Sequence, residues 1–495
     1  MQAPRLPTTQ KPRIAKNPLE SHWLHSLPVD RLPSSPPPSS AFHFDVAIVG
    51  AGLSGFSTAL HLSRLSRGTL RIAVLDARGV AGGASGRNGG LVRPGVPGAF
   101  ESVVALHGRE EAQRLGRFEF DSVAAMQQFV NECGDDTEWT ELKKGGFKAL
   151  STTDNRAEIE KDIHKWEEAG CNIQAHLVSR EQVVQLTGCK VNRNVTNGAV
   201  QFREWRVNPA KLVLAIASST LRENSNAYFY KECLVEKVLP DATRNLFSLE
   251  TSKGSFFARK VVYATNAWTS AILPELEITP VRNQVISTVP SSNPFWKDGT
   301  FAFIANAGRE YMSGRGDGRI VLGGMRYLAK QEDFGCDRDD ALNKTVSAAL
   351  KLYLPSKFDG FENEQVAVER EWAGIMGFTA DKTPYVGSLE AIGRGKEFVI
   401  AGFCGHGMTR CFLSGRAVAE MVLGLPISGN FPRSYLPTVA RIAGPARNHC
   451  KLEDYGHTFG AEMQTIKRHT RSKLPLYALV LLSVAAWLHW FLCKL

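Results

Sequence analysis

The sequence predicts a protein of the α/β class with at least two domains and a C-terminal transmembrane helix. An apolar run at residues 46–49 leads into a glycine-rich loop and then into apolar residues at helical spacing, a pattern typical of a parallel sheet covered by helices. The 495 residues exceed what one hydrophobic core usually organises. The stretch Leu474–Leu492 contains no formally charged residue. Together these features predict a multidomain α/β chain with a membrane segment at its end.

The first strand and helix flank a loop that is suited to phosphates. Residues 46–49 read VAIV and the next six read GAGLSG, which is the GxGxxG pattern in its required place between a strand and a helix. The three glycines permit a tight turn, close approach of a pyrophosphate and close packing of helix on strand. The helix N-terminus carries a partial positive charge that favours the phosphates. The predicted contacts are Gly50, Gly52, Leu53, Ser54 and Gly55.

The second predicted strand lies at residues 71–75 and ends at an acidic residue. Asp76 stands 21 residues after Gly55, where a carboxylate accepts both hydrogen bonds of an adenosine ribose and repels a 2′-phosphate. Ala77 and Arg78 follow it directly. The unit therefore predicts a dinucleotide site that disfavours NADP, with Asp76, Ala77 and Arg78 at its adenosine end.

Residues 82–90 read GGASGRNGG, a segment almost without side chains. Here the sequence resembles the DAO-type family of FAD-dependent amine and amino-acid oxidoreductases, which includes glycine-oxidase-like and sarcosine-oxidase-like members, and especially its gamma-glutamylputrescine-oxidase-like branch. The resemblance implies that this bare segment wraps the ribityl chain and ring of the flavin. The contacts it implies are Ala84, Ser85, Arg87, Asn88, Gly89 and Gly90.

Four later segments are similar to the family's motifs and occur in its order. They are VVYATNAWTSAIL from residue 261, EYMSGRGDGRIVLGGMR from 310, EWAGIMGFTADKTPYVGSL from 371 and AGFCGHGMTRCFLSGRAVAEMVLG from 401. The resemblance places a helix N-terminus at the flavin's pyrimidine edge, where it stabilises negative charge on the reduced ring. The implied contacts are Ala264, Thr265, Asn266, Gly405, His406, Gly407, Met408 and Thr409.

The FAD is expected to be bound without a covalent link. Some relatives attach it through a cysteine before the late TxD motif, but GIMGFTAD contains none. Others use a histidine in the first glycine-rich loop, where this chain has Arg87.

The resemblance also implies the domain organisation. An FAD-binding Rossmann-like domain of the glutathione-reductase type is expected together with a substrate domain built on an antiparallel α+β sheet. Asn17, Pro18 and Trp23 resemble a packed lead-in element of fungal-type relatives, within an N-terminal region otherwise expected to be solvated. The expected order is a Pro/Ser-rich arm (1–43), FAD-binding segments (44–99, 202–280 and 370–437), substrate segments (100–201 and 281–369), a basic tail (438–473) and the membrane segment (474–492).

The resemblance implies one reaction class, in which an amine C–H gives hydride to the flavin and the imine then hydrolyses. Oxygen, forming hydrogen peroxide, or another acceptor reoxidises the flavin, and the sequence leaves this choice open because no clear counterpart of an oxygen-activating lysine occurs around residues 320–321. Candidate catalytic residues are His406, Tyr311, Arg315 and Arg326, with a surface ion-pair role equally open for each arginine. Met376 stands where glycine-oxidase-like members have a substrate-binding arginine, which favours a longer or secondary amine over a simple α-amino acid.

Composition excludes several other functions. The net charge of +10 comes largely from the two ends of the chain, so no nucleic-acid surface is expected. The nine cysteines are scattered without a metal-binding rhythm, which predicts reduced thiols and no metal site. Two alternatives stay open: a flavin-dependent tRNA-modifying protein, and a flavin-binding scaffold without turnover.

The C-terminal stretch 474–492 has 19 residues, about 28 Å as a helix, which is close to the thickness of a bilayer's hydrocarbon core. Lys473 and Lys494 flank it, and Trp487 and Trp490 lie near one end. We expect a single-pass tail anchor with the catalytic domain in the cytosol. A buried terminal helix is one alternative, and the final CKL, similar to a peroxisomal signal, leaves the peroxisome as another.

Overall fold

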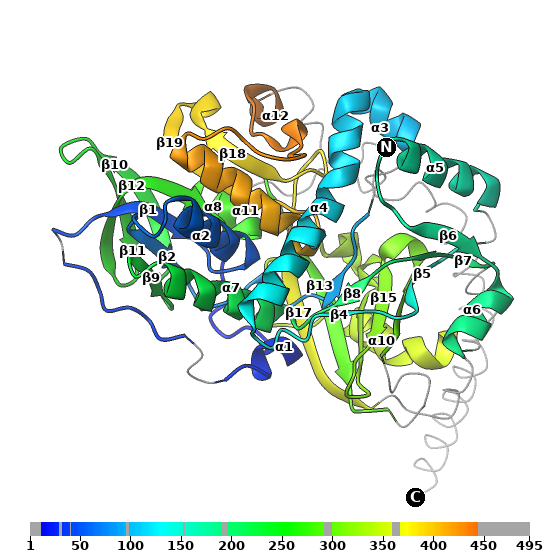
Figure 1. The fold of residues 1–495 in the computed structure, drawn as a ribbon. Coiled ribbons are helices and arrows are strands. Elements are labelled where there is room, and N and C mark those ends of the chain that lie inside the picture. The colour runs from blue at the N-terminus through cyan, green and yellow to red at the C-terminus, as the bar shows by residue number, and fades with distance from the viewer. Residues whose placement is uncertain are drawn as a thin grey trace, which may run out of the picture. The chain divides into compact units, whose positions relative to one another are not determined.

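The computed structural model describes residues 11–28, 32–39, 41–95, 99–151, 154–189, 197–291, 299–358 and 367–443, and two eight-stranded sheets organise them (Figure 1). The first sheet carries the GxGxxG loop at the end of its central strand. The second sheet lies next to the glycine-rich segment 82–90, because Tyr311 of this sheet packs against Gly89.

The first sheet has a parallel centre, with the strand order β10-β11-β12-β1-β2-β9 and with β19 and β18 continuing from β12. Its central strands are buried along most of their length, as expected for parallel strands covered on both faces. Its strands are β1 (Phe44–Val49), β2 (Ile72–Leu75), β9 (Ala227–Tyr230), β10 (Val235–Asp241), β11 (Leu246–Thr251), β12 (Gly254–Tyr263), β18 (Tyr385–Leu389) and β19 (Arg394–Ala401).

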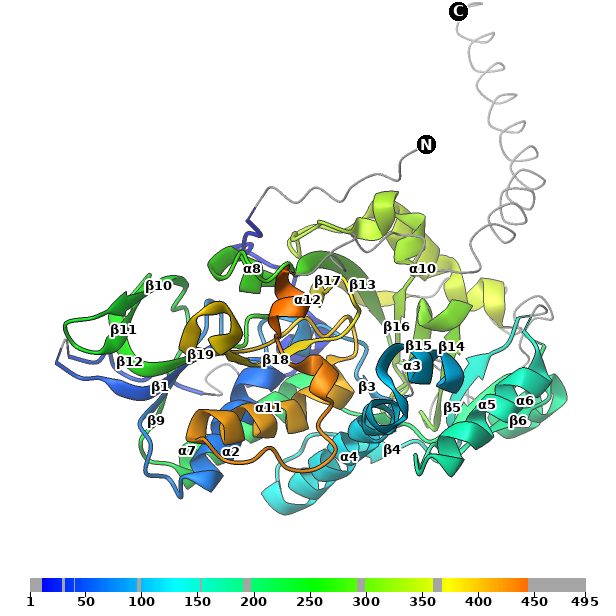
Figure 2. The ribbon, with the colours of Figure 1, turned by 90° about the horizontal axis from the view of Figure 1, so that it is seen from above.

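Three helices pack together beside this sheet: α2 (Leu53–Leu65), α7 (Pro209–Glu223) and α11 (Gly407–Leu423). Both views show α2 and α11 lying against each other (Figure 1 and Figure 2). A Cβ on Gly415 of α11 would lie 2.7 Å from the Cβ of Ser57 on α2, so a glycine permits this close crossing. The crossing brings the N-terminus of α11 toward the GxGxxG loop, because Ser54 Oγ donates to Cys411 Sγ over 3.1 Å.

The second sheet has the order β17-β13-β16-β15-β14-β5-β7-β6, antiparallel except between β14 and β5. Helix α10 (Lys344–Lys357) covers one face with an apolar core that includes Phe147, Phe303 and Met312. The strands are β5 (Gly145–Ala149), β6 (Ala175–Val178), β7 (Ala199–Phe202), β13 (Thr279–Thr288), β14 (Phe301–Ala305), β15 (Glu310–Gly314), β16 (Ile320–Gly324) and β17 (Val368–Phe378).

The remaining elements surround these two sheets. A small three-stranded sheet has the order β3-β8-β4, and α4 packs against α11. These elements are β3 (Leu91–Val92), β4 (Thr140–Glu141), β8 (Trp205–Arg206), α1 (His22–His25), α3 (Phe100–His107), α4 (Arg109–Cys133), α5 (Arg156–Glu168), α6 (Arg180–Thr187), α8 (Thr269–Ile272) and α12 (Val439–Ala443).

Residues 11–28 are packed against the rest of the chain, which corrects the expectation of a solvated arm at these positions. Trp23 is 0% exposed, and its Nε1 donates to the carbonyl of Asn88 over 2.6 Å. Ser21 Oγ donates to the carbonyl of Gly86, also over 2.6 Å. The glycine-rich segment has few side chains, so it leaves room for a tryptophan and offers its carbonyls as acceptors. We call residues 11–28 the N-terminal strap.

The predicted fold class was wrong in its last feature, the C-terminal transmembrane helix. Within the part of the chain that the structure describes, no helix is both long and apolar enough to cross a membrane. The longest of these helices, α4, has 25 residues but begins with Arg109, Glu110 and Glu111. The segment 474–492, on which the prediction depended, lies outside the described residues. The corrected class is an α/β fold with two large sheets.

Candidate cofactor site

The GxGxxG loop has a geometry that only glycine permits at two of its positions. Gly50 has a φ of +114°, and a Cβ there would lie 2.5 Å from the carbonyl oxygen of Ala264. A Cβ on Gly55 would lie 1.8 Å from the carbonyl oxygen of Gly50. Gly52 is the N-cap of α2 and offers no side-chain cap, and the first turn contains no acidic residue. The N-terminus of α2 therefore fits a pyrophosphate, as predicted for this loop.

Asp76 ties the two ends of the nucleotide unit together. Its carboxylate accepts hydrogen bonds from the backbone N–H groups of Ala51 (2.8 Å), Arg78 (2.7 Å) and Gly79 (2.9 Å). Burial raises the pKa of this carboxyl, and the three hydrogen bonds oppose the rise. A carboxylate offers about four acceptor positions, so one remains for a ribose hydroxyl. Asp76 thus fits the predicted ribose contact while it also holds the glycine loop.

The glycine-rich segment 82–90 makes room for aromatic side chains of the protein itself. A Cβ on Gly90, whose φ is +70°, would lie 2.8 Å from the ring of Trp23. A Cβ on Gly89 would lie 2.4 Å from the ring of Tyr311. The sequence predicted that the flavin ring accounts for the missing side chains. At Gly89 and Gly90 the chain's own rings already require them to be absent.

Arg87 is a buried residue that connects three segments of the chain. It is 3% exposed and donates to the carbonyls of Gly82 (3.0 Å), Leu19 (2.6 Å) and Ala373 (3.1 Å). Its Nε lies 3.7 Å from the carboxylate of Asp339, and burial lowers its pKa to about 10. Arg87 thus joins the glycine-rich segment, the strap and β17.

Asp339 contacts a second arginine, Arg78, as well as Arg87. The sequence did not indicate Asp339 as an important residue. It is 0% exposed, and Arg78 donates to both of its oxygens, over 2.7 and 2.9 Å. Arg78 also donates to the carbonyl of Ala15 in the strap and lies over the ring of Trp268. The loop before α10 contains three aspartates, Asp337, Asp339 and Asp340, so the sequence does not show which one is buried, and the partner Arg78 is 261 positions away in the chain.

The late glycine-rich motif lies at the N-terminus of α11. His406 is the N-cap residue and makes no side-chain cap, so the N–H groups of Gly407, Met408 and Thr409 begin the helix without one. The His406 Nδ1 lies 3.0 Å from the carbonyl of Cys404. His406 is exposed by surface area, yet burial among surrounding atoms and the charge of Arg410 lower its pKa.

A buried charge network lies under this helix N-terminus. Glu119 of α4 accepts hydrogen bonds from Arg410 Nε (2.6 Å) and Thr409 Oγ1 (2.9 Å). Burial opposes its ionisation, but Arg410, His406 and these hydrogen bonds hold the pKa of Glu119 below its ordinary value. The network fixes the first turn of α11 against α4.

The predicted contacts from separate segments meet at one place. Asn88 Nδ2 lies 3.3 Å from Met408 Sδ, which joins the glycine-rich segment to α11. A Cβ on Gly405 would lie 3.4 Å from Met376 Sδ on β17. Asn266, with a φ of +45°, accepts a hydrogen bond from Gly402 N over 3.1 Å. Ala264 N donates to the carbonyl of Val49, and the hydroxyls of Thr265 and Thr269 bond to each other.

The remaining predicted residues lie within these same segments. Leu53 N donates to Ser85 Oγ over 2.9 Å, so the GxGxxG loop and the glycine-rich segment are joined directly. Asn88 Nδ2 donates to the carbonyl of Ser85, and its Oδ1 accepts from Gly90 N. Ala77 and Ala84 are partly exposed beside them.

The three candidate catalytic residues on or just beyond β15 and β16 fall into different environments. Tyr311 faces the glycine-rich segment, and its hydroxyl accepts a hydrogen bond from Asn283 Nδ2 over 3.2 Å. Arg315 is 3% exposed, pairs with Glu138 over 2.7 Å and lies over the ring of Trp23. Arg326 pairs with Glu332 over 2.7 Å. The structure therefore brings Tyr311 to the predicted site and places both arginines in ion pairs.

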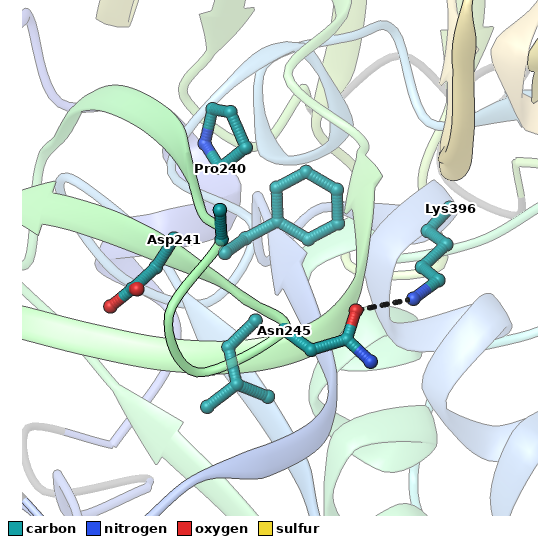
Figure 3. Close-up of a pocket in the computed structure, with 7 residues that line it drawn as sticks. Pro240, Asp241, Asn245 and Lys396 are labelled. Atoms are coloured by element: carbon teal, nitrogen blue, oxygen red, sulfur yellow. Dashed lines mark hydrogen bonds between the residues drawn. The ribbon is translucent and has the colours of Figure 1, made fainter.

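A hollow at the turn between β10 and β11 is unrelated to this site (Figure 3). Its lining includes Pro240, Asp241 and Lys396, and Lys396 Nζ donates to Asn245 Oδ1 over 3.0 Å. It contains none of the predicted contacts. Among the residues described, no group of three or more His, Cys, Asp or Glu side chains is arranged to hold a metal ion.

The arrangement fits a flavin dinucleotide. The glycine loop and the N-terminus of α2 fit the pyrophosphate, Asp76 retains acceptor capacity for a ribose, and the N-terminus of α11 meets Asn88 and Met376 where the ring is expected. These groups come from five separate stretches of sequence.

Comparison with known proteins agrees with this fit. The family described as FAD dependent oxidoreductase (DAO) matches residues 45–421. The gamma-glutamylputrescine oxidoreductase of Escherichia coli is 24% identical over 389 residues, which cover 77% of this chain and 84% of that protein. A probable oxidoreductase, OrdL, of Haemophilus influenzae is 24% identical and covers 79% of this chain and 85% of that protein. Glycine oxidase of Geobacillus kaustophilus is 22% identical and covers 77% and 93%.

Solved structures show the same fold. The crystal structure of glycine oxidase from Geobacillus kaustophilus has a TM-score of 0.62 at 19% identity and covers 80% of this chain and 98% of that one. L-proline dehydrogenase from P. horikoshii has a TM-score of 0.64 at 19% identity, covering 80% and 97%. The predicted resemblance and the predicted cofactor, FAD, are thereby confirmed.

Proposed function

Because the chain belongs to the FAD dependent oxidoreductase (DAO) family, we propose that it oxidises a C–N bond of an amine or amino-acid-derived substrate. The observation that carries the proposal is the meeting of Asn88, Met408 and Met376 at the N-terminus of α11, on the side to which Tyr311 packs. FAD, when bound there, supplies the acceptor for the hydride of the C–H next to the amine nitrogen.

The residues of the chain contribute position and charge. The uncapped N–H groups at the start of α11 favour negative charge beside them, and the buried pair of Glu119 and Arg410 holds that helix turn in place. Burial lowers the pKa of His406, which favours the neutral imidazole, and its free ring nitrogen is available to accept a hydrogen bond from the substrate amine. The Tyr311 hydroxyl, held by Asn283, donates toward a polar group of the substrate.

Three finer features belong to the same proposal. FAD is held without a covalent bond, since no cysteine occurs in GIMGFTAD and Arg87 is committed to backbone carbonyls. The imine product hydrolyses in water, and oxygen or another acceptor takes the electrons. The protein works in a compartment that keeps thiols reduced, an inference supported by its seven described cysteines, all of them free.

The test is a panel of amines and amino acids read by bleaching of the bound flavin, first without oxygen and then in air. An amine that bleaches the flavin anaerobically identifies the reductant. Return of the absorbance in air, with hydrogen peroxide formed, identifies an oxidase, and a flavin that stays bleached identifies a dehydrogenase. A protein that binds FAD and is bleached by dithionite but by no amine contradicts the proposal.

A further inference from the structure

Strand β9 ends the strand order of the first sheet on its side, among the residues that the structure describes, and β2 is its inner neighbour. On the inner side, the carbonyl of Tyr230 accepts a hydrogen bond from Asp76 N over 3.0 Å. The backbone groups of Phe229, one residue earlier in β9, point to the outer side, where they bond to a segment outside the sheet. An outer edge of this kind is a template for pairing with another chain unless it is covered.

One residue of the proline-rich segment, Ser35, bonds to both outward backbone groups of Phe229. Ser35 N donates to the carbonyl of Phe229 over 2.7 Å, and Phe229 N donates to Ser35 Oγ over 3.1 Å. The serine thus supplies the donor and the acceptor that a neighbouring strand would supply, and the acceptor comes from its side chain. Leu32 is 8% exposed and belongs to the same apolar core as Phe229, so packing also holds the segment on β9.

The prolines on both sides of Ser35 cannot continue this pairing. Pro33, Pro36, Pro37 and Pro38 have no backbone N–H to donate. The first three of these prolines are exposed, so the outer side of the segment presents proline rings to the solvent. Proline at an edge is a feature by which β proteins avoid pairing with other chains. The segment therefore covers β9 without creating a new edge that could pair.

We infer that residues 32–39 form an edge cap, which occupies β9 and prevents a second copy of this chain from pairing with that strand. Without the edge cap, the N–H and C=O of Phe229 lose both partners beside an apolar core. Two copies of β9 then pair in antiparallel orientation, because a twofold axis brings the same strand of each copy together. The edge cap lies outside residues 45–421, which match the family, and the inference does not depend on the proposed function.

The first experiment measures the mass of the FAD-loaded full chain by sedimentation velocity over a wide range of concentration. Ser35→Pro removes the N–H and the hydroxyl, and with them both bonds to Phe229. Its mass is expected to approach twice that of the wild type as the concentration rises. Ser39→Pro is the matched control in the same segment, because Ser39 contributes its carbonyl, which accepts from Phe42 N, and a proline retains that group. A Ser35→Pro protein that sediments as the wild type does overturns the inference.

The second experiment tests whether this association involves β9. Ala227 lies on β9 two residues before Phe229 and is half-buried. Ala227→Lys places a charge on the edge strand, which opposes pairing with another chain. Added to Ser35→Pro, it is expected to restore the mass of the wild type, and alone it should leave the mass unchanged. Association that persists in the double variant takes place through another surface and contradicts the role assigned to β9.

The third experiment uses a milder variant, so that it does not depend on the folding of a proline variant. Ser35→Ala removes the Oγ that accepts from Phe229 N and retains the bond donated by Ser35 N. Hydrogen exchange of the Phe229 amide should become about tenfold faster than in the wild type, since one hydrogen bond is lost. The Asp76 amide, which bonds to Tyr230 on the inner side, is the internal control and should not change. Equal exchange of the Phe229 amide in both proteins means that other groups protect this edge, and the edge cap is then refuted.

Discussion

The glycine-bearing edge of the first sheet and the face of the second sheet that carries Tyr311 are built by different means. At the first, mainly backbone groups form the site. The N-termini of α2 and α11 present N–H groups, and Gly50 and Gly55 allow neighbouring backbone carbonyls to come close. At the second, side chains from separate strands share one face of the sheet: Tyr311 lies on β15 and Lys148 on β5, with β14 between them. A backbone site selects a constant ligand such as a dinucleotide, whereas a side-chain surface is free to change with the substrate.

The strap joins these two regions, which limits how independently each can change. Trp23 packs on Gly90, lies under the guanidinium of Arg315 and meets the ring of Trp372 edge-on, at 6.4 Å between centroids. Asp339 accepts Leu19 N at its carbonyl and Arg78 at its carboxylate. Substitutions that affect only one region are therefore expected away from the strap, and substitutions in the strap are expected to affect both.

The largest expected effect is at the backbone site. Gly55→Ala puts a Cβ 1.8 Å from the carbonyl oxygen of Gly50, a backbone atom that cannot move aside without displacing the loop. We expect loss of FAD, measured as flavin absorbance per chain after gel filtration. Gly395→Ala is the control, since a Cβ there meets no atom within 4 Å. A Gly55→Ala protein with full FAD content would show that the loop tolerates the displacement.

The second prediction concerns the strap. Trp23→Ala should lower the free energy of unfolding by about 3–5 kcal/mol, because it empties a fully buried site between the two regions. The effect is measured by urea denaturation. Unfolding is monitored through flavin release and through far-UV circular dichroism, a signal that does not depend on tryptophan. Leu106→Ala, at a side chain 78% exposed, should change stability by less than about 0.5 kcal/mol. A small loss for Trp23→Ala would mean that the strap packs on the protein without stabilising it.

The backbone site was largely predictable from sequence, because its signals are local. Gly50, Gly52, Gly55 and Asp76 lie within one strand–helix–strand unit, and their types follow from steric clearance and ribose geometry. The family motif around His406 likewise identified a helix N-terminus. The family resemblance also suggested Trp23 as part of a packed element, though not where it packs.

The second sheet was less predictable, since its surface depends on cross-strand register. Lys148 and Tyr311 lie on the same face of the sheet only because β5 pairs with β14 in one register, and a shift of one residue would turn Lys148 to the α10 face. Asp339 and Glu204 acquire their importance from arginines remote in sequence. For Arg315 and Arg326, the resemblance to the family's strand pair over the flavin suggested the site, but the local sequence did not indicate their acidic partners, Glu138 and Glu332.

The third prediction uses the pH dependence of Glu204. Burial raises its pKa from 4.5 to about 7, so the folded chain retains a proton that the unfolded chain releases over this interval. The contribution of Glu204 to stability is therefore most favourable at low pH and is lost as pH rises through this interval. Relative to Glu204→Gln, the wild type should lose about 1–3 kcal/mol of unfolding free energy between roughly pH 5 and pH 8. A difference between the two proteins that does not change with pH would place the carboxyl in a more hydrated environment.

The smallest effect is expected at Tyr311, where the second sheet meets the backbone site. Tyr311→Phe keeps the ring that packs on Gly89 and removes the hydroxyl that accepts from Asn283, so the FAD content should not change. We expect stability to fall by about 1 kcal/mol and kcat/KM for the amine to fall by up to about tenfold, because a single hydrogen bond is lost. Tyr327→Phe is the control, since its hydroxyl bonds to Glu310 and its ring packs against the core under α10. If Tyr311→Phe releases FAD, the hydroxyl holds the glycine-rich segment in place, and the division between a backbone site for the cofactor and a side-chain surface for the substrate does not apply at this residue.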